Sequence, residues 1–423
     1  MRVKQILLLL IFLKFLLEYA YITFTSKYFS YSGFALDISI SKYIFGWVVY
    51  VLGYKLLFRK RSLFIFEIYY VLFLIYILPN IIFYSLSNQD TGYFLILTLP
   101  YFVIVALTNS SDTFKIKSFK WSKPMILLIS FSSILLVLVN YLIVTGGEMV
   151  WSFYDVYDFR TKFAEESSTS IFAYLNGWAS KIFCVVILAW AIYKKKIFLS
   201  LLFVMLILLL FAFSGHKSVL QSLFLIPLFY LMNKSKNSVN VITLSFIILI
   251  LISIFLATVQ DINMISSLIL RRLLFVPTHL NFVYLDFFSN NPNIYWSNSI
   301  LKFFIPYPYD ELKASAVVGN YLGKDMAANT GFIACGFMHA GLIGVCIYTI
   351  FAIIMFKFIN LFSNKIEKYF LQAIIFIPIY TMFVSSDLLT TLFTHGLIIG
   401  IFVLWMYDNK NYNLIFNKFK YKI

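Results

Sequence analysis

The stretch VITLSFIILILISIFLATV, residues 241–259, has nineteen consecutive residues without a charge. A helix of about 20 apolar residues crosses the roughly 30 Å hydrocarbon core of a bilayer, so this stretch predicts a transmembrane helix. The whole chain has a matching composition: 61% of its 423 residues are hydrophobic and 12% are charged. Soluble domains have about 45–50% apolar residues and about 25% charged residues. The composition therefore excludes a soluble enzyme with a single anchor.

Similar apolar runs recur along the whole chain. They lie near 5–25, 36–57, 63–84, 93–108, 125–144, 171–193, 197–213, 218–232, 241–259, 340–359, 370–387 and 391–407. The first run has no clear small-x-small cleavage site, so we expect an uncleaved first helix. We predict an all-α polytopic integral membrane protein with about twelve transmembrane helices, forming one membrane domain over residues 1–423.

Basic residues separate these runs in a regular alternation. The formal net charge is +16, from 34 Lys and Arg against 18 Asp and Glu. Every second connecting segment is basic; these segments contain Arg2/Lys4, Arg59/Lys60/Arg61, Lys115/Lys117/Lys120/Lys123, Lys194/Lys195/Lys196, Lys234/Lys236, Lys365/Lys368 and Lys410/Lys418/Lys420/Lys422. Basic segments favour the cytoplasmic side, so we predict both termini there. The charge then reflects topology, and no nucleic-acid partner is expected.

Two of the predicted outer segments are long, 145–170 and 260–339. The second has 80 residues, and connections of that length are usually functional. Its first part has apolar residues at helical spacing, interrupted by Pro277, which would kink or split a helix. We therefore expect a large outer loop with short amphipathic helices on the outer leaflet.

The sequence has none of the common cofactor motifs. It contains no GxGxxG, Walker A or HExxH motif and no DxD-like pair for a metal-bound nucleotide sugar. Its three cysteines form no CxxC pair, which argues against a zinc site or a disulfide framework. We expect no metal and no cofactor. An enzyme of this kind would need an activated substrate that already lies in the membrane.

Arginine is rare in this chain, with six residues against 28 lysines. Arg160, Arg271 and Arg272 lie in the two long outer segments, where the positive-inside rule disfavours them. The planar guanidinium binds phosphate oxygens in pairs and keeps its charge. These arginines therefore predict an anionic ligand such as a diphosphate. The alternative is that they pair with acids of the same segments.

The first outer segment interleaves acids, aromatic rings and cations around Asp158 and Arg160, with Glu165 shortly after them. Rings and carboxylates suit a sugar site, although enrichment of aromatics at the bilayer interface explains the rings equally well. Lys217 follows a short turn, Ser214-Gly215-His216, at a predicted helix end. It is a candidate ligand for phosphate, and the alternative is a lysine that reaches out to water.

The second outer segment carries further candidates. Arg272, His279 and Asp286 are seven residues apart, so a regular helix would place them on one stripe, with Tyr284 nearby. Further on, Asn329 precedes a glycine-rich entry to the next apolar run, and that entry contains His339. His339 is either a base or a satisfied residue of a helix interface. Candidate bases are thus Asp158, Glu165, Asp286 and His339.

This pattern resembles the bacterial O-antigen and capsular repeat-unit polymerases and the related O-antigen ligases. The resemblance covers most of the chain as architecture. Its local matches are Arg160 with Gly177 beyond it, 214–217, the Arg271–Arg272 segment, and Asn329-Thr330-Gly331 followed by 341–344. Family polymerases often have Arg where this chain has His216-Lys217, which weakens a direct phosphate role for that turn. Ligases usually have a His-Asn pair where this chain has Asn329-Thr330, which favours the polymerases.

The resemblance implies an inverting, metal-independent glycosyltransferase in the bacterial plasma membrane, with its active site facing outward. Its substrates would be undecaprenyl-diphosphate-linked oligosaccharides, used in lipopolysaccharide or capsule biosynthesis, and a chain-length regulator would be a further partner. Arg160, Arg271 and Arg272 would stabilise the leaving diphosphate. Two alternatives stay open: an O-antigen ligase or other lipid-linked glycosyltransferase, and a flippase or exporter without enzymatic activity.

Overall fold

The computed structural model describes residues 3–60, 65–108, 122–152, 155–163, 170–235, 237–260, 263–311, 313–364 and 366–407. The structure is 80% helical, and the described residues contain no strand. Within these residues, ten helical segments are long and apolar enough to cross a membrane, and three shorter apolar helices cover 91–107, 221–232 and 368–384. The prediction of an all-α, multi-pass membrane protein is therefore confirmed.

The chain forms two compact units. Unit 1 contains residues 1–110, 235–357 and 381–388, and unit 2 contains 111–234, 358–380 and 389–423. Three helices contribute residues to both units: α17 (Phe332–Asn360), α18 (Lys368–Val384) and α19 (Leu388–Phe393). Each candidate site below lies within one unit and is described there.

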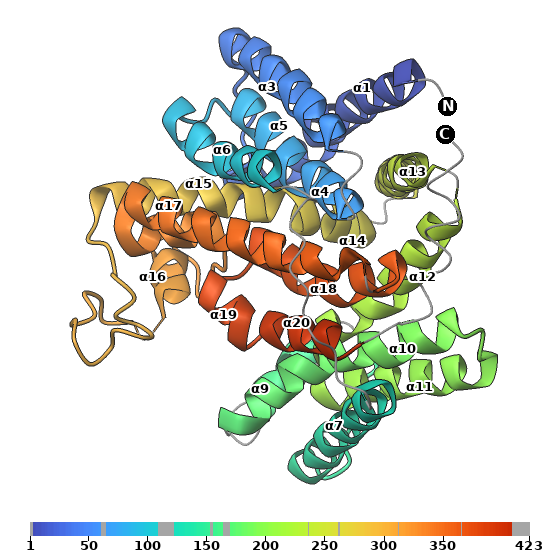
Figure 1. Cartoon of the computed structure of the whole chain (residues 1–423). Helices are drawn as coiled ribbons and strands as arrows, with labels where there is room; N and C mark the ends of the chain where they lie inside the picture. Colours follow the sequence, from blue (N-terminus) through green and yellow to red (C-terminus); the bar gives the residue numbers. More distant parts are fainter. Residues whose placement is uncertain are drawn as a thin grey trace. The chain divides into compact units, whose positions relative to one another are not determined.

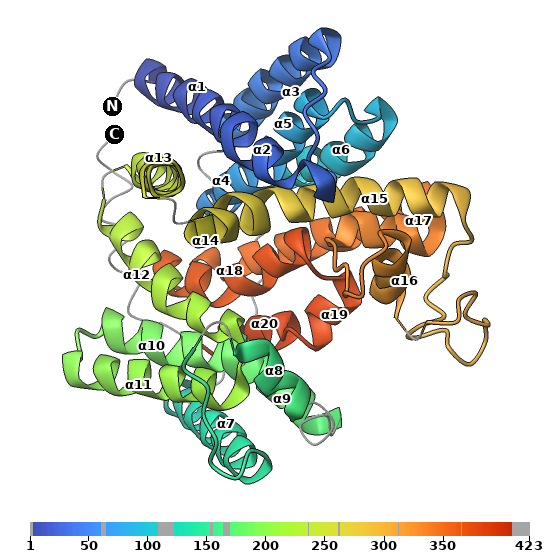
Figure 2. The ribbon, with the colours of Figure 1, turned by 180° about the vertical axis from the view of Figure 1, so that it is seen from behind.

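Unit 1 is built around one fully buried helical segment, Phe66–Leu86, which comprises α4, the π-helix η3 and α5. A helix that is apolar on all sides is stable only when neighbours cover it. Its neighbours include α3 (Ile40–Arg59), α6 (Thr91–Leu107), α13 (Ser238–Val259) and α15 (Val276–Asn290). The unit also contains α1 (Val3–Ala20), α2 (Ser26–Phe29) and α16 (Ala314–Tyr321). Figures 1 and 2 show α15 beside the first part of α17.

Charged residues inside the first helices of unit 1 have partners. Lys14 forms an i,i+4 ion pair with Glu18, and its ammonium lies 3.9 Å from the centre of the Trp47 ring. Farther along, Glu67 accepts a hydrogen bond of 2.9 Å from Ser238. Buried charges are tolerated when they are paired in this way. These residues hold helices together, so they give no support to a polar translocation path.

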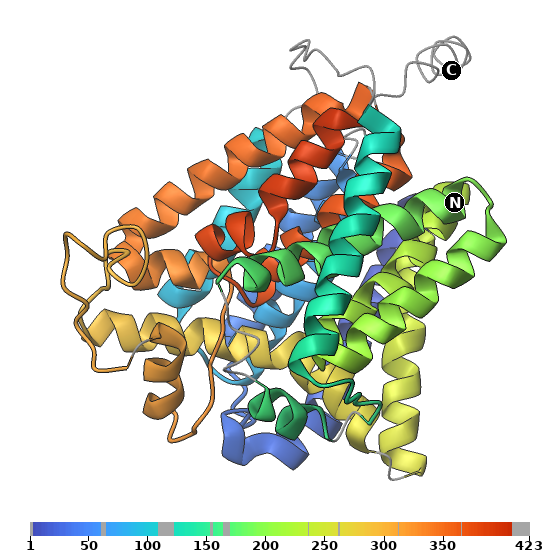
Figure 3. The ribbon, with the colours of Figure 1, turned by 90° about the horizontal axis from the view of Figure 1, so that it is seen from below.

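The segment after α13 differs from the prediction of short amphipathic helices. Residues 263–290 form one continuous helical segment of α14 (Asn263–Ser266), the π-helix η7 (Ser267–Phe275) and α15. Pro277 does not split it, because the proline sits in the first turn of α15, directly after the wider π-helical turns. The π-helix also shifts the register, so Arg272 and His279 do not follow a regular stripe. Figure 3 shows α15 running across the direction of α13 rather than back along it.

Unit 2 consists of helices from the middle and the end of the chain. Its long members are α7 (Ser122–Val144), the continuous α9–η5–α10 (Ser170–Tyr193) and α11 (Ile197–Ser214). The short helix α8 (Val156–Lys162) lies in the segment 145–170, which the sequence predicts to be outside, and α12 (Gln221–Lys234) follows the turn after α11. The last described helix is α20 (Leu397–Met406).

A close backbone approach positions the 381–388 segment in unit 1. A Cβ atom at Gly331 would overlap the carbonyl oxygen of Phe383, and the rings of Phe332 and Phe383 are 4.9 Å apart. Gly331→Ala should therefore destabilise the protein by about 1–3 kcal/mol, because backbone has to move. Thermal unfolding in detergent measures this loss.

Gly46→Ala is the matched control, since the nearest atom to its added Cβ is a methyl carbon of Ile81 at 3.2 Å. Alanine inside helix α3 should leave stability unchanged or raise it by about 0.5–1 kcal/mol. Equal unfolding temperatures for the two variants would contradict the proposed contact at Gly331.

Candidate functional site

Helix α17 is broken near its start. Ala340 and Gly341 have non-helical backbone angles, with φ −153° and ψ 37° at Ala340 and φ 55° and ψ −140° at Gly341. The break removes the helical donors for the carbonyls of the preceding turn, residues 337–339. A carbonyl inside a membrane protein needs another donor, because lipid offers none. Broken helices of this kind line the binding sites of many membrane proteins.

The loop after α15 supplies the missing donors. The Asn293 side chain donates to the Phe337 carbonyl at 2.9 Å, and the backbone N–H of Tyr295 donates to the His339 carbonyl at 2.9 Å. To do this, Tyr295 and Trp296 adopt positive φ values of 42° and 57°. Each such residue costs about 1–3 kcal/mol, and strain of this kind concentrates at functional sites.

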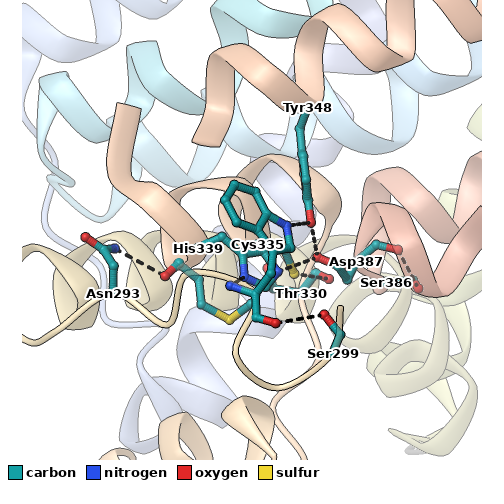
Figure 4. A network of polar contacts seen from close by, with 10 residues as sticks. Asn293, Ser299, Thr330, Cys335, His339, Tyr348, Ser386 and Asp387 are labelled. Carbon is teal, nitrogen blue, oxygen red and sulfur yellow. Dashed lines mark hydrogen bonds and ion pairs between the residues drawn. The ribbon is translucent and has the colours of Figure 1, made fainter. Parts of the chain in front are cut away.

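A closed ring of hydrogen bonds, here named the Asp387 ring, forms at the break (Figure 4). The Trp296 backbone N–H donates to His339 Nδ1 at 3.2 Å, and His339 Nε2 lies 3.1 Å from Asp387 Oδ2. The Tyr348 hydroxyl donates to the same oxygen at 2.9 Å, and the Trp296 indole N–H donates to that hydroxyl at 2.9 Å. The Trp296 and His339 rings stack with centroids 4.9 Å apart.

The Asp387 ring fixes the tautomer of His339 and the orientation of the Asp387 carboxylate. Because His339 Nδ1 accepts a hydrogen bond, the neutral imidazole carries its proton on Nε2 and donates it to Asp387. His339 and Tyr348 are each 2% exposed, whereas the Asp387 side chain is 17% exposed. Asp387 is thus a carboxylate with a fixed direction and access from outside. This arrangement can accept a proton from a substrate hydroxyl.

Sequence reasoning found one member of this ring and missed the others. His339 was a candidate base or interface residue, and the structure makes it the partner of Asp387. Trp296, Tyr348 and Asp387 come from three separate segments, so no spacing connects them. The available signal was a single acid, Asp387, at the end of the apolar run 370–387.

The two neighbouring arginines of unit 1 lie on the π-helix η7. The Arg271 guanidinium lies 4.2 Å from the centre of the Phe29 ring, and its Nε is buried without a hydrogen-bond partner among the described residues. Arg272 is exposed. The pair thus places positive charge in the first half of the segment 263–290.

The other predicted residues of the second outer segment have varied surroundings. His279 packs against the rings of Phe34 and Phe83, at 5.3 and 5.7 Å, and fills the space beside Gly33. Tyr284 is buried and donates to the Ala328 carbonyl at 2.8 Å. Asp286 accepts a hydrogen bond from Tyr321 at the surface, and Asn329 is exposed. The contacts of His279 and Tyr284 are those of core residues.

A second constellation lies in unit 2, where Arg160 on α8 reaches the turn after α11. Gly215 ends α11 with φ 63°, and a Cβ at this position would lie 3.0 Å from Arg160 Cγ. Glycine at this position therefore adopts the left-handed backbone of the turn and leaves room for the Arg160 side chain. His216 follows at once. The side chain of Lys217 lies outside the described part of the structure, as does Glu165.

A lysine and a histidine meet within the same unit. Lys181 is 8% exposed, and its Nζ lies 2.5 Å from Nδ1 of His395. Tight packing sets this geometry: Trp178 donates to the Phe393 carbonyl at 2.6 Å, and a Cβ at Gly177 would overlap the Thr394 carbonyl oxygen. The described residues form no ion pair with Lys181.

Arg160, Lys181, His216 and His395 together form what we name the basic cluster. Burial, followed by the charges of Arg160 and Lys181, lowers the pKa of His216 from 6.5 to about 4. His216 is therefore neutral at physiological pH, and the exposed Arg160 guanidinium supplies the permanent charge of the cluster. A guanidinium binds phosphate oxygens in pairs, so Arg160 is suited to an anion such as phosphate.

Helix α8 also borders a surface hollow of about 450 Å³. The hollow is lined by Met149, Val150, Trp151, Ser152, Asp155, Asp158, Phe159 and Lys162. Aromatic rings stack on the apolar faces of sugars, and carboxylates accept hydrogen bonds from hydroxyls. Asp158, predicted as a candidate base, thus lies in a surface suited to a glycan. Among the described residues, no three His, Cys, Asp or Glu side chains form a metal-binding group.

The low pKa of His216 predicts a pH dependence of stability. In the unfolded chain, His216 binds a proton below about pH 6.5. In the folded protein, it binds one only below about pH 4. Stability should therefore fall as the pH decreases from 6.5 towards 4, and this contribution should be flat above 6.5. Thermal unfolding of the wild type and of His216→Gln over this range isolates the effect. The same pH dependence of the unfolding temperature in both proteins would show that His216 is exposed to water in the folded protein.

Comparison with family models, with curated proteins and with solved structures finds no match to this chain. Its function therefore has to be inferred from the geometry and charge of the Asp387 ring, the basic cluster and the membrane fold itself.

Proposed function

We propose that this chain is a polysaccharide polymerase of the bacterial plasma membrane. It joins undecaprenyl-diphosphate-linked oligosaccharide repeat units on the outer face of the membrane, in O-antigen or capsule synthesis. The observation that carries the proposal is the Asp387 carboxylate, oriented by His339 and Tyr348 beside a broken membrane helix. A fixed, accessible carboxylate at such a break is suited to activating a hydroxyl group.

The proposed reaction is one displacement at a sugar carbon. The acceptor hydroxyl oxygen bonds to the anomeric carbon of the donor glycan, and its proton passes to Asp387. The bond between that carbon and the diphosphate oxygen breaks, and the lipid diphosphate leaves with the electron pair. Attack from the opposite side inverts the anomeric configuration. Proton acceptance by a positioned group contributes about 10²–10⁴-fold to such a reaction.

The leaving diphosphate needs positive charge in the transition state. Two groups of arginines are separate candidates for this role. Unit 1 has Arg271 and Arg272 on η7, and unit 2 has Arg160 within the basic cluster. Each group is a candidate on its own evidence: the Arg271 Nε is buried without a hydrogen-bond partner among the described residues, and Arg160 lies against the turn that ends α11.

The proposed topology has twelve crossings and both termini in the cytoplasm. It counts the three shorter apolar helices as crossings and leaves out the segment 263–290. That segment is long enough to cross, but α15 runs across the direction of α13, which supports a position along the outer surface (Figure 3). The basic segments then all face the cytoplasm.

A purified protein in nanodiscs tests the activity directly. Lipid-diphosphate-linked repeat units should be converted into a ladder of longer chains, sized on a gel. In a deletion strain, single repeat units should still reach their final anchor while the ladder disappears. Polymer that accumulates on the lipid carrier would instead indicate a ligase. Repeat units trapped in the inner leaflet would indicate a flippase.

Asp387→Asn tests the proposed base. Asparagine has the same size but cannot take a proton, so turnover should fall by about 100-fold or more. Binding of the lipid-linked substrate should stay within about threefold, because the carboxylate acts on the proton. Asp310→Asn, an exposed acid of unit 1, is the matched control and should keep full activity. Full activity of Asp387→Asn would show that Asp387 is not the base.

Arg160 tests the leaving-group role. Arg160→Ala should lower the turnover by about 10²–10³-fold, the usual cost of losing one donor to developing charge. Arg160→Lys should recover only part of it, because an ammonium lacks the paired donors of arginine. Arg59→Ala, at the far end of α3, is the control for loss of one arginine. Wild-type ladders from Arg160→Ala would refute a contact with the diphosphate.

A further inference from the structure

Unit 2 has a groove on its surface between α10 (Cys184–Tyr193), α11 and α12, which lie side by side in Figures 1 and 2. The groove has a volume of about 580 Å³. Its lining is Leu188, Ile192, Lys195, Ile197, Ser200, Leu201, Val204, Leu223, Pro227, Tyr230 and Lys234. Most of these side chains are aliphatic, and they belong to helices that face lipid.

The body of the groove is suited to a hydrocarbon chain. Ile197 is 76% exposed and Leu201 61% exposed, although both are fully apolar. Pro227 lies inside α12, where a proline bends a helix because it clashes with the turn before it. The groove lies beside this proline, between helices that would otherwise pack together. In a bilayer, such an apolar channel holds acyl chains.

Both charged residues of the lining are lysines, Lys195 and Lys234. The Lys234 ammonium lies 4.3 Å from the centre of the Tyr230 ring, which is also part of the lining. Both lysines belong to basic segments on the predicted cytoplasmic side. Two cations beside an apolar channel are complementary to a lipid that carries a net negative head group.

The backbone at Lys195 gives an independent observation. Lys195 has φ 53°, in the left-handed region that glycine adopts without strain. Lys195 is the residue after the C-cap of α10. Its N–H donates to the Ile192 carbonyl at 3.0 Å, and the Lys196 N–H donates to the Ala191 carbonyl at 2.9 Å. This bonding pattern usually has glycine at that position. Here a lysine occupies it, and its side chain lines the groove.

We propose that this groove binds one anionic phospholipid of the cytoplasmic leaflet. An acyl chain occupies the apolar channel, and the head-group phosphate lies between Lys195 and Lys234. The proposal does not depend on the polymerase activity, because the groove is formed only by α10, α11 and α12. A zwitterionic head group would bring its own cation towards the two lysines, so phosphatidylglycerol should bind better than phosphatidylcholine.

Adjacent lysines allow a matched test. Lys195→Gln and Lys196→Gln remove the same charge from the same turn, but only Lys195 lines the groove. Native mass spectrometry of the full chain, titrated with phosphatidylglycerol, should show about a fivefold weaker Kd for Lys195→Gln, the effect of about 1 kcal/mol per basic residue at a membrane surface. Lys196→Gln should bind like the wild type. Equal loss in both variants would overturn the proposal.

Lys195→Gly separates lipid binding from folding. Glycine suits the left-handed backbone, so the thermal stability in detergent without phospholipid should be unchanged or higher. The stabilisation by phosphatidylglycerol should be smaller than in the wild type, as the fivefold weaker Kd requires. A clear loss of stability without lipid would show that the side chain serves the fold, and equal stabilisation by phosphatidylcholine would exclude head-group recognition. Displacement of phosphatidylglycerol by equimolar undecaprenyl diphosphate would reassign the groove to the lipid carrier.

Discussion

A helix inside a membrane cannot break unless other donors take over its freed carbonyls. In this protein, the loop 293–296 meets that condition for α17, through the Asn293 side chain and the N–H groups that follow it. The same loop brings Trp296 onto His339, and the Asp387 ring closes from there. The site thus depends on the need to satisfy backbone polar groups where water is absent.

The two candidate sites use polar chemistry in different ways. In unit 1, hydrogen bonds hold a carboxylate in one direction at a broken helix. In unit 2, close packing at Gly177 and Gly215 brings Lys181 and Arg160 near two histidines. A carboxylate with fixed donors is suited to taking up a proton, and an exposed arginine is suited to holding an anion. Each unit thus offers one kind of polar chemistry, and the function proposed above would use both kinds.

Part of the candidate site could be predicted from the sequence. Arg160 and His339 were singled out because each is an uncommon residue type in an unfavourable place, and both lie within polar constellations. The stripe through Arg272, His279 and Asp286 assumed a regular helix, whereas η7 is a π-helix that changes the register before Pro277. His279 consequently packs among aromatic rings, and Asp286 bonds Tyr321 at the surface. Local spacing cannot anticipate such a change, because tertiary contacts select the wider turn.

The lipid environment and the predominantly helical structure of this protein could be predicted from its sequence. Apolar runs as long as 241–259 can satisfy their backbone in lipid only as helices, so composition and run length were sufficient. Which polar residues meet depends on the packing of the helices. Trp296, Tyr348 and Asp387 are far apart in the chain, and their hydrogen bonds arise from a helix break and a close glycine contact. Contacts of that range depend on how helices pack, which the local pattern of residues does not encode.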